Sequence, residues 1–146
     1  MTDRELAVSA WESLFRAQVG VLRILGAEFP TKEMSLNEYD VLFNLSLQPD
    51  RRARLRDINQ LVLLSQPSVS RLIDRLVARG LVSKHPDPAD KRGTIVAITD
   101  AGFASYRDAA RHHMATITEL MGSALSDDEL TQLKRLTSKL RSPDGE

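Results

Sequence analysis

The 146 residues suffice for one domain with a hydrophobic core, and 42% hydrophobic with 27% charged residues is typical of a globular protein rather than a disordered or membrane-embedded one. The 20 Lys and Arg balance the 20 Asp and Glu, and the lack of cysteine excludes disulfides, thiolate metal sites and thiol-based redox sensing. Because no apolar run has the length of a signal peptide or a membrane span, we expect a cytoplasmic protein without a membrane partner.

The charges are unevenly distributed along the chain. Between Arg51 and Arg92, ten Lys or Arg stand against four Asp or Glu, and the rest of the chain carries the compensating negative charge. Such a basic segment is typical of a surface that faces phosphates, although a solvated charged face would have the same composition.

The N-terminal half predicts three helices. In the first, apolar residues recur at helical spacing around much of the circumference, which is typical of a helix buried between other elements. Trp11 lies on this stripe, where it would pack in the core or line an aromatic pocket. Ser35 and Glu38 form a capping box that starts a second helix, which ends at a Gln-Pro-Asp turn. A shorter third helix is expected around Leu55–Leu63.

The next helix is the most informative one. Ser65 is expected as its N-cap, Pro67 in its first turn and Gly80 as its left-handed C-terminal cap. One face is apolar, formed by Val69, Leu72, Ile73, Leu76 and Val77. The opposite face is small, hydroxylic and cationic, and it contains Pro67, Ser68, Ser70, Arg71, Asp74, Arg75 and Ala78. Such a face suits the DNA major groove, where arginine bonds guanine and hydroxyl groups bond phosphates.

A short hairpin is predicted after this helix. Residues 81–84 and 94–99 are predicted to form strands, and the polar loop 85–93 between them is too long for a tight turn. Two prolines stiffen this loop, and Lys91 and Arg92 are adjacent cations on its far side. Helix, turn, helix and basic hairpin follow one another in the order of a winged helix–turn–helix.

The C-terminal part predicts two further helices. An apolar seam at heptad-like spacing runs from Phe103 to Leu120 and includes His113, for which we expect an interface position rather than a ligand role. His112 is expected on the surface, and His85 near phosphate. Ser126 and Glu129 form a second capping box before a leucine-lined helix. The seams at both ends would pack in a dimer or onto the chain's own core.

Three motifs carry a resemblance to a known family: the Ser-Gln-Pro-Ser-Val-Ser-Arg-Leu-Ile-Asp-Arg-Leu run (65–76), the Asp-Lys-Arg-Gly of the wing (90–93), and Ile-Thr-Asp-Ala-Gly (98–102). On these residues the chain resembles the MarR family of bacterial transcriptional regulators. The resemblance implies a triangular homodimer in which terminal helices form the dimer and two winged lobes bind a palindromic site. It also implies that small phenolic or lipophilic acids bind between the dimerisation region and the lobe and weaken DNA binding.

The predicted fold is therefore mainly α with a small β-hairpin, a single MarR-like domain over residues 1–146. Residues 1–30 and 103–142 would be dimerisation helices that flank a winged helix–turn–helix lobe at 34–100. The predicted function is a homodimeric, sequence-specific DNA-binding regulator, a ligand-responsive repressor; the alternative is a winged-helix protein-interaction module that binds no DNA.

The predicted sites follow from these residues and from the resemblance. DNA contacts are expected from Arg54, Arg56, Ser65, Gln66, Pro67, Ser68, Ser70, Arg71, Asp74, Arg75, Lys84, Lys91 and Arg92. The resemblance places residues 65–75 in the major groove and Arg92 in the minor groove, with Asp90 bracing the wing by pairing with a cation. Asp74 would accept from cytosine or orient Arg71 or Arg75.

Other functions find little support in the sequence. Trp11, Phe15 and Tyr39 are candidates for an aromatic ligand pocket. Arg51 and Arg52 would reach DNA less readily than Arg54 and Arg56, because they could belong to a solvated loop. No metal site or cofactor is expected, since adjacent histidines point apart on a helix. No glycine loop for phosphate and no nucleophile–base pair is present, so we expect no enzyme activity.

Overall fold

The computed structural model describes residues 2–29, 32–62 and 68–141. The chain forms α1 (Arg4–Glu28), α2 (Leu36–Ser46), the 3₁₀ turn η1 (Pro49–Arg51), β1 (Arg52–Arg54), α3 (Leu55–Leu61) and α4 (Val69–Ala78). It continues with β2 (Val82–Asp87), β3 (Asp90–Ile98), α5 (Asp100–Ala124) and α6 (Asp127–Arg141). The predicted fold class is confirmed, and the hairpin gains a third strand because β1 pairs antiparallel with β3 in the order β1-β3-β2.

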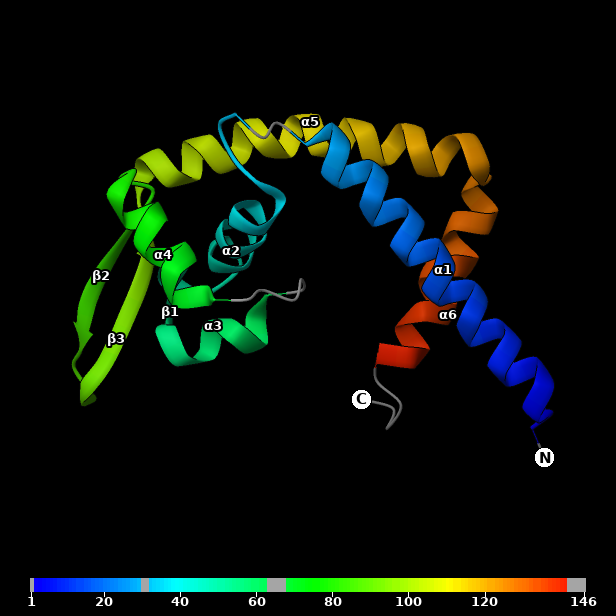
Figure 1. Cartoon of the computed structure of the whole chain (residues 1–146), viewed down its shortest axis with the longest axis horizontal. Coiled ribbons are helices and arrows are strands. Elements are labelled where there is room, and N and C mark those ends of the chain that lie inside the picture. The colour runs from blue at the N-terminus through cyan, green and yellow to red at the C-terminus, as the bar shows by residue number, and fades with distance from the viewer. Residues whose placement is uncertain (1, 30–31, 63–67, 142–146) are drawn as a thin grey trace.

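Two regions make up the molecule, and α5 connects them (Figure 1). The lobe, residues 36–98, holds α2, α3, α4 and the sheet. The arm, formed by α1, α6 and the part of α5 beside them, extends on the right of the view. The lobe contains most of the buried apolar side chains, whereas α1 buries Leu25 alone and α6 buries none of its described residues.

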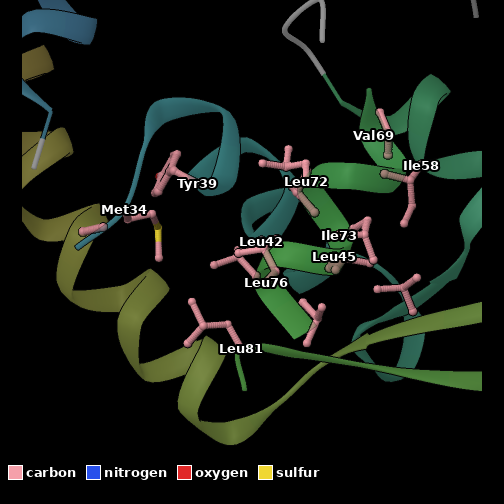
Figure 2. Packing of buried hydrophobic residues seen from close by; sticks show 14 of the residues in the cluster. Met34, Tyr39, Leu42, Leu45, Ile58, Val69, Leu72, Ile73, Leu76 and Leu81 are labelled. Atoms are coloured by element: carbon pink, nitrogen blue, oxygen red, sulfur yellow. The ribbon is translucent and has the colours of Figure 1, made fainter. Parts of the chain in front are cut away.

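The core of the lobe lies between α2 and α4. Figure 2 shows Leu42 and Leu45 of α2 beside the buried face of α4, with Met34 and Leu81 near α5. On α4 the buried residues are Val69, Leu72, Ile73 and Leu76, as the helical spacing predicts. The exception is Val77, which is 37% exposed. Burial of this face therefore leaves the opposite, polar face of α4 in solvent.

Local caps set the helix boundaries. The two predicted capping boxes are confirmed: Ser35 and Glu38 bond each other's backbone amides at the start of α2, and Ser126 and Glu129 do so before α6. Gly80 has φ +73°, the left-handed conformation expected after a helix. The predicted N-cap of α4 is wrong, because α4 starts at Val69 and Ser68 caps it through a bond from the Arg71 amide (3.3 Å). Ser65 and Pro67 lie outside the described residues.

The wing is a tight hairpin, which corrects the expected long loop. In the β2–β3 ladder, Pro86 lies opposite Thr94 and the next residue, Asp87, lies opposite Asp90. Residues 91–93 of β3 therefore have no partner in β2 and form a bulge. Pro88 follows Asp87 in the turn, where its fixed φ is favourable. The Asp87 carboxylate accepts the Ala89 amide (2.9 Å), which closes the turn. Pro86 is tolerated because β2 is an edge strand.

The lobe meets α5 at a close contact between Gly102 and Leu81. The Thr99 hydroxyl accepts the Gly102 amide (3.0 Å) and donates to the Gly80 carbonyl (2.6 Å), which holds the start of α5 against the end of α4. A Cβ built on Gly102 would collide with the backbone carbonyl of Leu81. Only glycine therefore allows this approach.

We predict that Gly102→Ala lowers the free energy of unfolding by about 3 kcal/mol, because the added methyl group must displace backbone. Urea unfolding followed by circular dichroism measures the change. Gly122→Ala in the same helix is the matched control, since a Cβ there meets nothing within 4 Å. It should leave stability unchanged or raise it by up to about 1 kcal/mol. Equal stability of the two variants would contradict the close contact.

Candidate nucleic-acid interface

The exposed face of α4 carries Ser70, Arg71, Asp74 and Arg75. Among the described residues, no ion pair or side-chain hydrogen bond engages the guanidinium of Arg71 or Arg75. Ser68, one turn before Leu72, is half-buried because its hydroxyl caps the helix. The exposed face of α4 thus offers a hydroxyl group and two guanidinium groups that pair with no other described residue.

Asp74 pairs with Lys84 of β2. The carboxylate does not bond to Arg71 or Arg75, the two arginines that the sequence suggested it would orient. Instead it joins the middle of α4 to the first strand of the wing. Both side chains stay partly exposed, so the pair lies on the same surface as Arg71.

A second ion pair holds the wing, and it is not the expected one. Asp87 is almost fully buried, with 3% of its side chain exposed, and its Oδ2 lies 3.0 Å from Nε of Arg54. Asp90, predicted as the brace, instead accepts the Arg92 amide (3.0 Å) and pairs with no cation among the described residues. Asp87 can brace the wing because it faces β1, a strand that sequence periodicity did not reveal.

The two pairs and the bulge bring several predicted residues together. A hollow of about 300 Å³ opens between α3, α4 and the wing, and its walls include Arg54, Arg56, Ser70, Asp90 and Arg92. Lys91 and Arg92 are exposed in the bulge of β3, and Arg56 is exposed in the first turn of α3. Ser65, Gln66 and Pro67 lie outside the described residues. The predicted DNA contacts that are described therefore gather around α4 and the wing.

Arg51 and Phe103 form a contact that sequence reasoning missed. Arg51 is exposed in the turn η1, and its guanidinium lies 3.7 Å from the centre of the Phe103 ring at the start of α5. Asp50 and Arg51 both have positive φ, 57° and 54°, in the turn that leads into β1. The position of this arginine depends on α5, which is about fifty residues away in the sequence.

The predicted aromatic pocket is not formed within one chain. Trp11 and Phe15 contact each other on α1, with ring centres 5.7 Å apart, and are 58% and 51% exposed. The prediction that Trp11 packs in the core is therefore wrong for the single chain. Tyr39 lies elsewhere, in a buried cluster where α2, α5 and the end of α1 meet, with Phe29, Phe43, Tyr106 and His113.

Burial changes the titration of this cluster. Burial, together with the neighbouring Tyr106, raises the pKa of Tyr39 to about 12. Burial and the nearby His112 lower the pKa of His113, whose ring packs on Phe29 and Tyr39. The neutral forms of both side chains are thus favoured, which suits an apolar junction between arm and lobe. His112 is exposed, as expected, and His85 bonds the Ser83 hydroxyl (2.8 Å).

Within the described residues, no group of three or more His, Asp or Glu side chains could hold a metal ion. Over the same residues, no helix combines the length and the apolar character that crossing a membrane requires.

Helix–turn–helix and hairpin, with a half-exposed helix beside a basic wing, define a winged helix–turn–helix protein. The model of the MarR family matches residues 32–93, which cover most of the lobe. The HTH-type transcriptional regulator PecS of Dickeya dadantii is 27% identical over 130 residues, 88% of this chain and 77% of PecS. The chain is therefore similar to regulators of the MarR family, both in sequence and in fold.

Solved structures agree in fold over nearly the whole chain. BpsR of Bordetella bronchiseptica, whose DNA binding is regulated by 6-hydroxynicotinic acid, has a TM-score of 0.77 at 26% identity, covering 91% of this chain and 98% of BpsR. The MarR-family regulator Sco3205 of Streptomyces coelicolor, solved in complex with DNA, has a TM-score of 0.78 at 22% identity. The match covers 100% of this chain and 91% of Sco3205.

We predict that Asp87→Ala loosens the wing, because it leaves Arg54 unpaired and removes the acceptor that closes the turn. Stability should fall by about 1–3 kcal/mol, and amide hydrogen exchange should accelerate in residues 82–98. Asp90→Ala is the control, since it removes a single exposed bond to a backbone amide. Equal exchange in the two variants would refute the assignment of Asp87 as the brace.

Proposed function

We propose that this protein is a homodimeric, sequence-specific DNA-binding transcriptional regulator, a ligand-responsive repressor that binds a palindromic operator. One observation carries the proposal: Arg71 and Arg75 of α4, which form no ion pair with another described residue, lie beside the basic wing, and the Asp74–Lys84 pair joins helix and wing. Helix and wing can therefore engage one duplex together. The proposed role is binding rather than catalysis, as the names of the relatives suggest.

The residues divide by the part of the duplex that they would contact. In the major groove, Ser70, Arg71 and Arg75 of α4 would bind base edges or phosphates, and Arg92 of the wing would enter the minor groove. Cations around them would bind the DNA backbone: Arg54, Arg56, Lys84 and Lys91. Ser68, together with Ser65, Gln66 and Pro67 outside the described residues, completes the set of proposed DNA contacts. Asp74 would position Lys84 rather than accept from a base, which its ion pair supports.

The arm supports the proposal of a dimer. Large apolar side chains stay exposed along its helices, including Leu6 (68%), Trp11 (58%), Met114 (58%) and Leu140 (67%). An apolar surface of this extent is typical of an interface with another protein. We propose that residues 1–30 and 103–142 pack against a second copy, so that two lobes contact half-sites about 10 bp apart.

Ligand response is proposed at the junction of arm and lobe. A small aromatic or lipophilic acid bound there would change the angle between the regions and so the spacing of the two α4 helices. The aromatic cluster around Tyr39 supports an aromatic ligand, because its rings could stack on one. BpsR, which 6-hydroxynicotinic acid regulates, is the similar protein that suggests this chemistry.

We predict that Arg71→Ala and Arg92→Ala each weaken specific DNA binding by about 1–3 kcal/mol, because each removes a base or groove contact. Operator fragments are first selected from genomic DNA, and affinity is then measured by fluorescence anisotropy. The melting temperature and the mass in solution should stay unchanged. Arg111→Ala removes the same charge from α5 and should bind like the unaltered protein.

Two outcomes would count against this assignment. If both variants bind as tightly as Arg111→Ala, the DNA-contacting surface lies elsewhere. If the unaltered protein shifts no genomic fragment in an electrophoretic mobility assay even at low salt, where phosphate contacts are strongest, the proposal of DNA binding is wrong. A winged-helix module for protein interaction would then remain.

We predict that Leu140→Glu weakens the dimer, because it places a charge in an apolar interface. Sedimentation equilibrium should show monomers at concentrations where the unaltered protein is dimeric. Leu47→Glu is the matched control, since Leu47 is 65% exposed and Leu140 67%, yet Leu47 lies in the lobe. Dimers of equal strength in both variants would exclude this part of α6 from the interface.

A further inference from the structure

Arg79 connects the end of α4 to the segment that joins α1 and α2. It is the C-cap of α4, and its Nη1 donates to Oε2 of Glu38 at 2.6 Å. Its Nη2 donates to the backbone carbonyl of Glu33. One guanidinium therefore holds the helix proposed to read DNA against the first turn of α2 and the residues that precede it.

Glu38 is shared between two structural roles. Its Oε1 accepts the Ser35 amide (3.2 Å) in the capping box, while its Oε2 accepts from Arg79. The same carboxylate thus sets where α2 begins and where α4 ends. Glu38 is mostly buried, with 15% of its side chain exposed, whereas 43% of the Arg79 side chain is exposed. Burial of the acceptor limits the directions in which Arg79 can bond.

The segment that Arg79 holds comes directly from the arm. At the end of α1, the Glu28 carbonyl accepts from Nε2 of His112 on α5 at 2.9 Å. Phe29 and Met34 then enter the core of the lobe. Glu33 and Glu38, which bond Arg79, therefore lie on one path by which a displacement of α1 can reach the lobe, beside the direct contact of Phe29 with Tyr39. Arg79 is the side chain through which α4 contacts this path.

We propose that Arg79 is a positioning residue that couples the arm to α4 and thereby sets DNA affinity without contacting DNA. This inference rests on the proposed function. Two observations support it over direct contact: the guanidinium is occupied by a carboxylate and a carbonyl, and it lies at the opposite end of α4 from Ser68. Because partly exposed ion pairs contribute little to global stability, the effect should appear in binding rather than in unfolding.

The test compares Arg79→Gln, Glu38→Gln and the double variant on the selected operator. Glutamine at position 38 keeps the capping box, because Gln serves at this position as Glu does. Each single variant should bind about tenfold more weakly, within the roughly threefold to thirtyfold range of such couplings. The double variant should bind no more weakly than either single one, since all three lack the same contact.

Lys32→Gln is the matched control. Lys32 lines the same surface cleft as Arg79, and within the described part of the chain no hydrogen bond or ion pair engages it. Its loss removes one positive charge near the contact and leaves the contact intact. Binding by this variant should equal that of the unaltered protein.

Salt dependence separates positioning from phosphate contact. A lost phosphate contact reduces the slope of log affinity against log salt by about one, whereas a lost positioning contact leaves the slope unchanged. A reduced slope for Arg79→Gln would overturn the proposal. Affinity equal to that of Lys32→Gln would also overturn it.

A second readout does not depend on DNA. The Gly80 and Leu81 amides donate to the Val77 and Leu76 carbonyls at 2.9 and 3.0 Å, directly beside Arg79. Their hydrogen exchange should accelerate in Arg79→Gln and in Glu38→Gln but not in Lys32→Gln. Unchanged exchange would refute the coupling. Faster exchange in a protein that binds no operator would refute the proposed function and leave the structural contact supported.

Discussion

Burial of one face of α4 is the constraint on which the rest of this structure depends. Leu72, Ile73 and Leu76 are almost completely buried in the core of the lobe. Each such side chain stabilises the fold by about 1.5–3 kcal/mol relative to an exposed one, so α4 cannot rotate about its axis without a large loss. The opposite face must therefore point into solvent. Hydrophobic packing, rather than a polar contact, presents Arg71 and Arg75 to a partner.

Three ion pairs then refine the position of this helix and of the wing. Lys84–Asp74 joins β2 to α4, Arg54–Asp87 joins β1 to the wing turn, and Arg79–Glu38 joins α4 to α2. Water weakens the Lys84–Asp74 and Arg79–Glu38 pairs, whose cations are partly exposed, so these two add little to stability, whereas the buried carboxylate of Asp87 makes the third pair costly to break. Their importance is geometric, because each connects elements that the core alone would leave free to shift by small distances.

The arm follows a different rule from the lobe. Its helices are long and capped, but their apolar side chains remain largely exposed in the single chain. Helices of this kind are stabilised mainly by the packing of an apolar face, and a second chain would supply that packing. The junction at Tyr39 and His113, which is buried and favours uncharged rings, is where the two regions meet. A change in the arm can reach the lobe through this junction, through the neighbouring segment that Arg79 holds, or along α5 itself.

The sequence by itself determined the features that depend on residues within about one helical turn. The capping boxes at Ser35 and Ser126, the left-handed Gly80 and the buried face of α4 all follow from short-range spacing. Ser65 and Ser68 are both suitable N-caps, and only the packing of α4 decided for Ser68. Tertiary structure also decided the partners of Asp74 and Asp87, the existence of β1 and the exposure of Trp11. These features depend on contacts between distant segments, or on a partner outside the chain, and no local pattern records them.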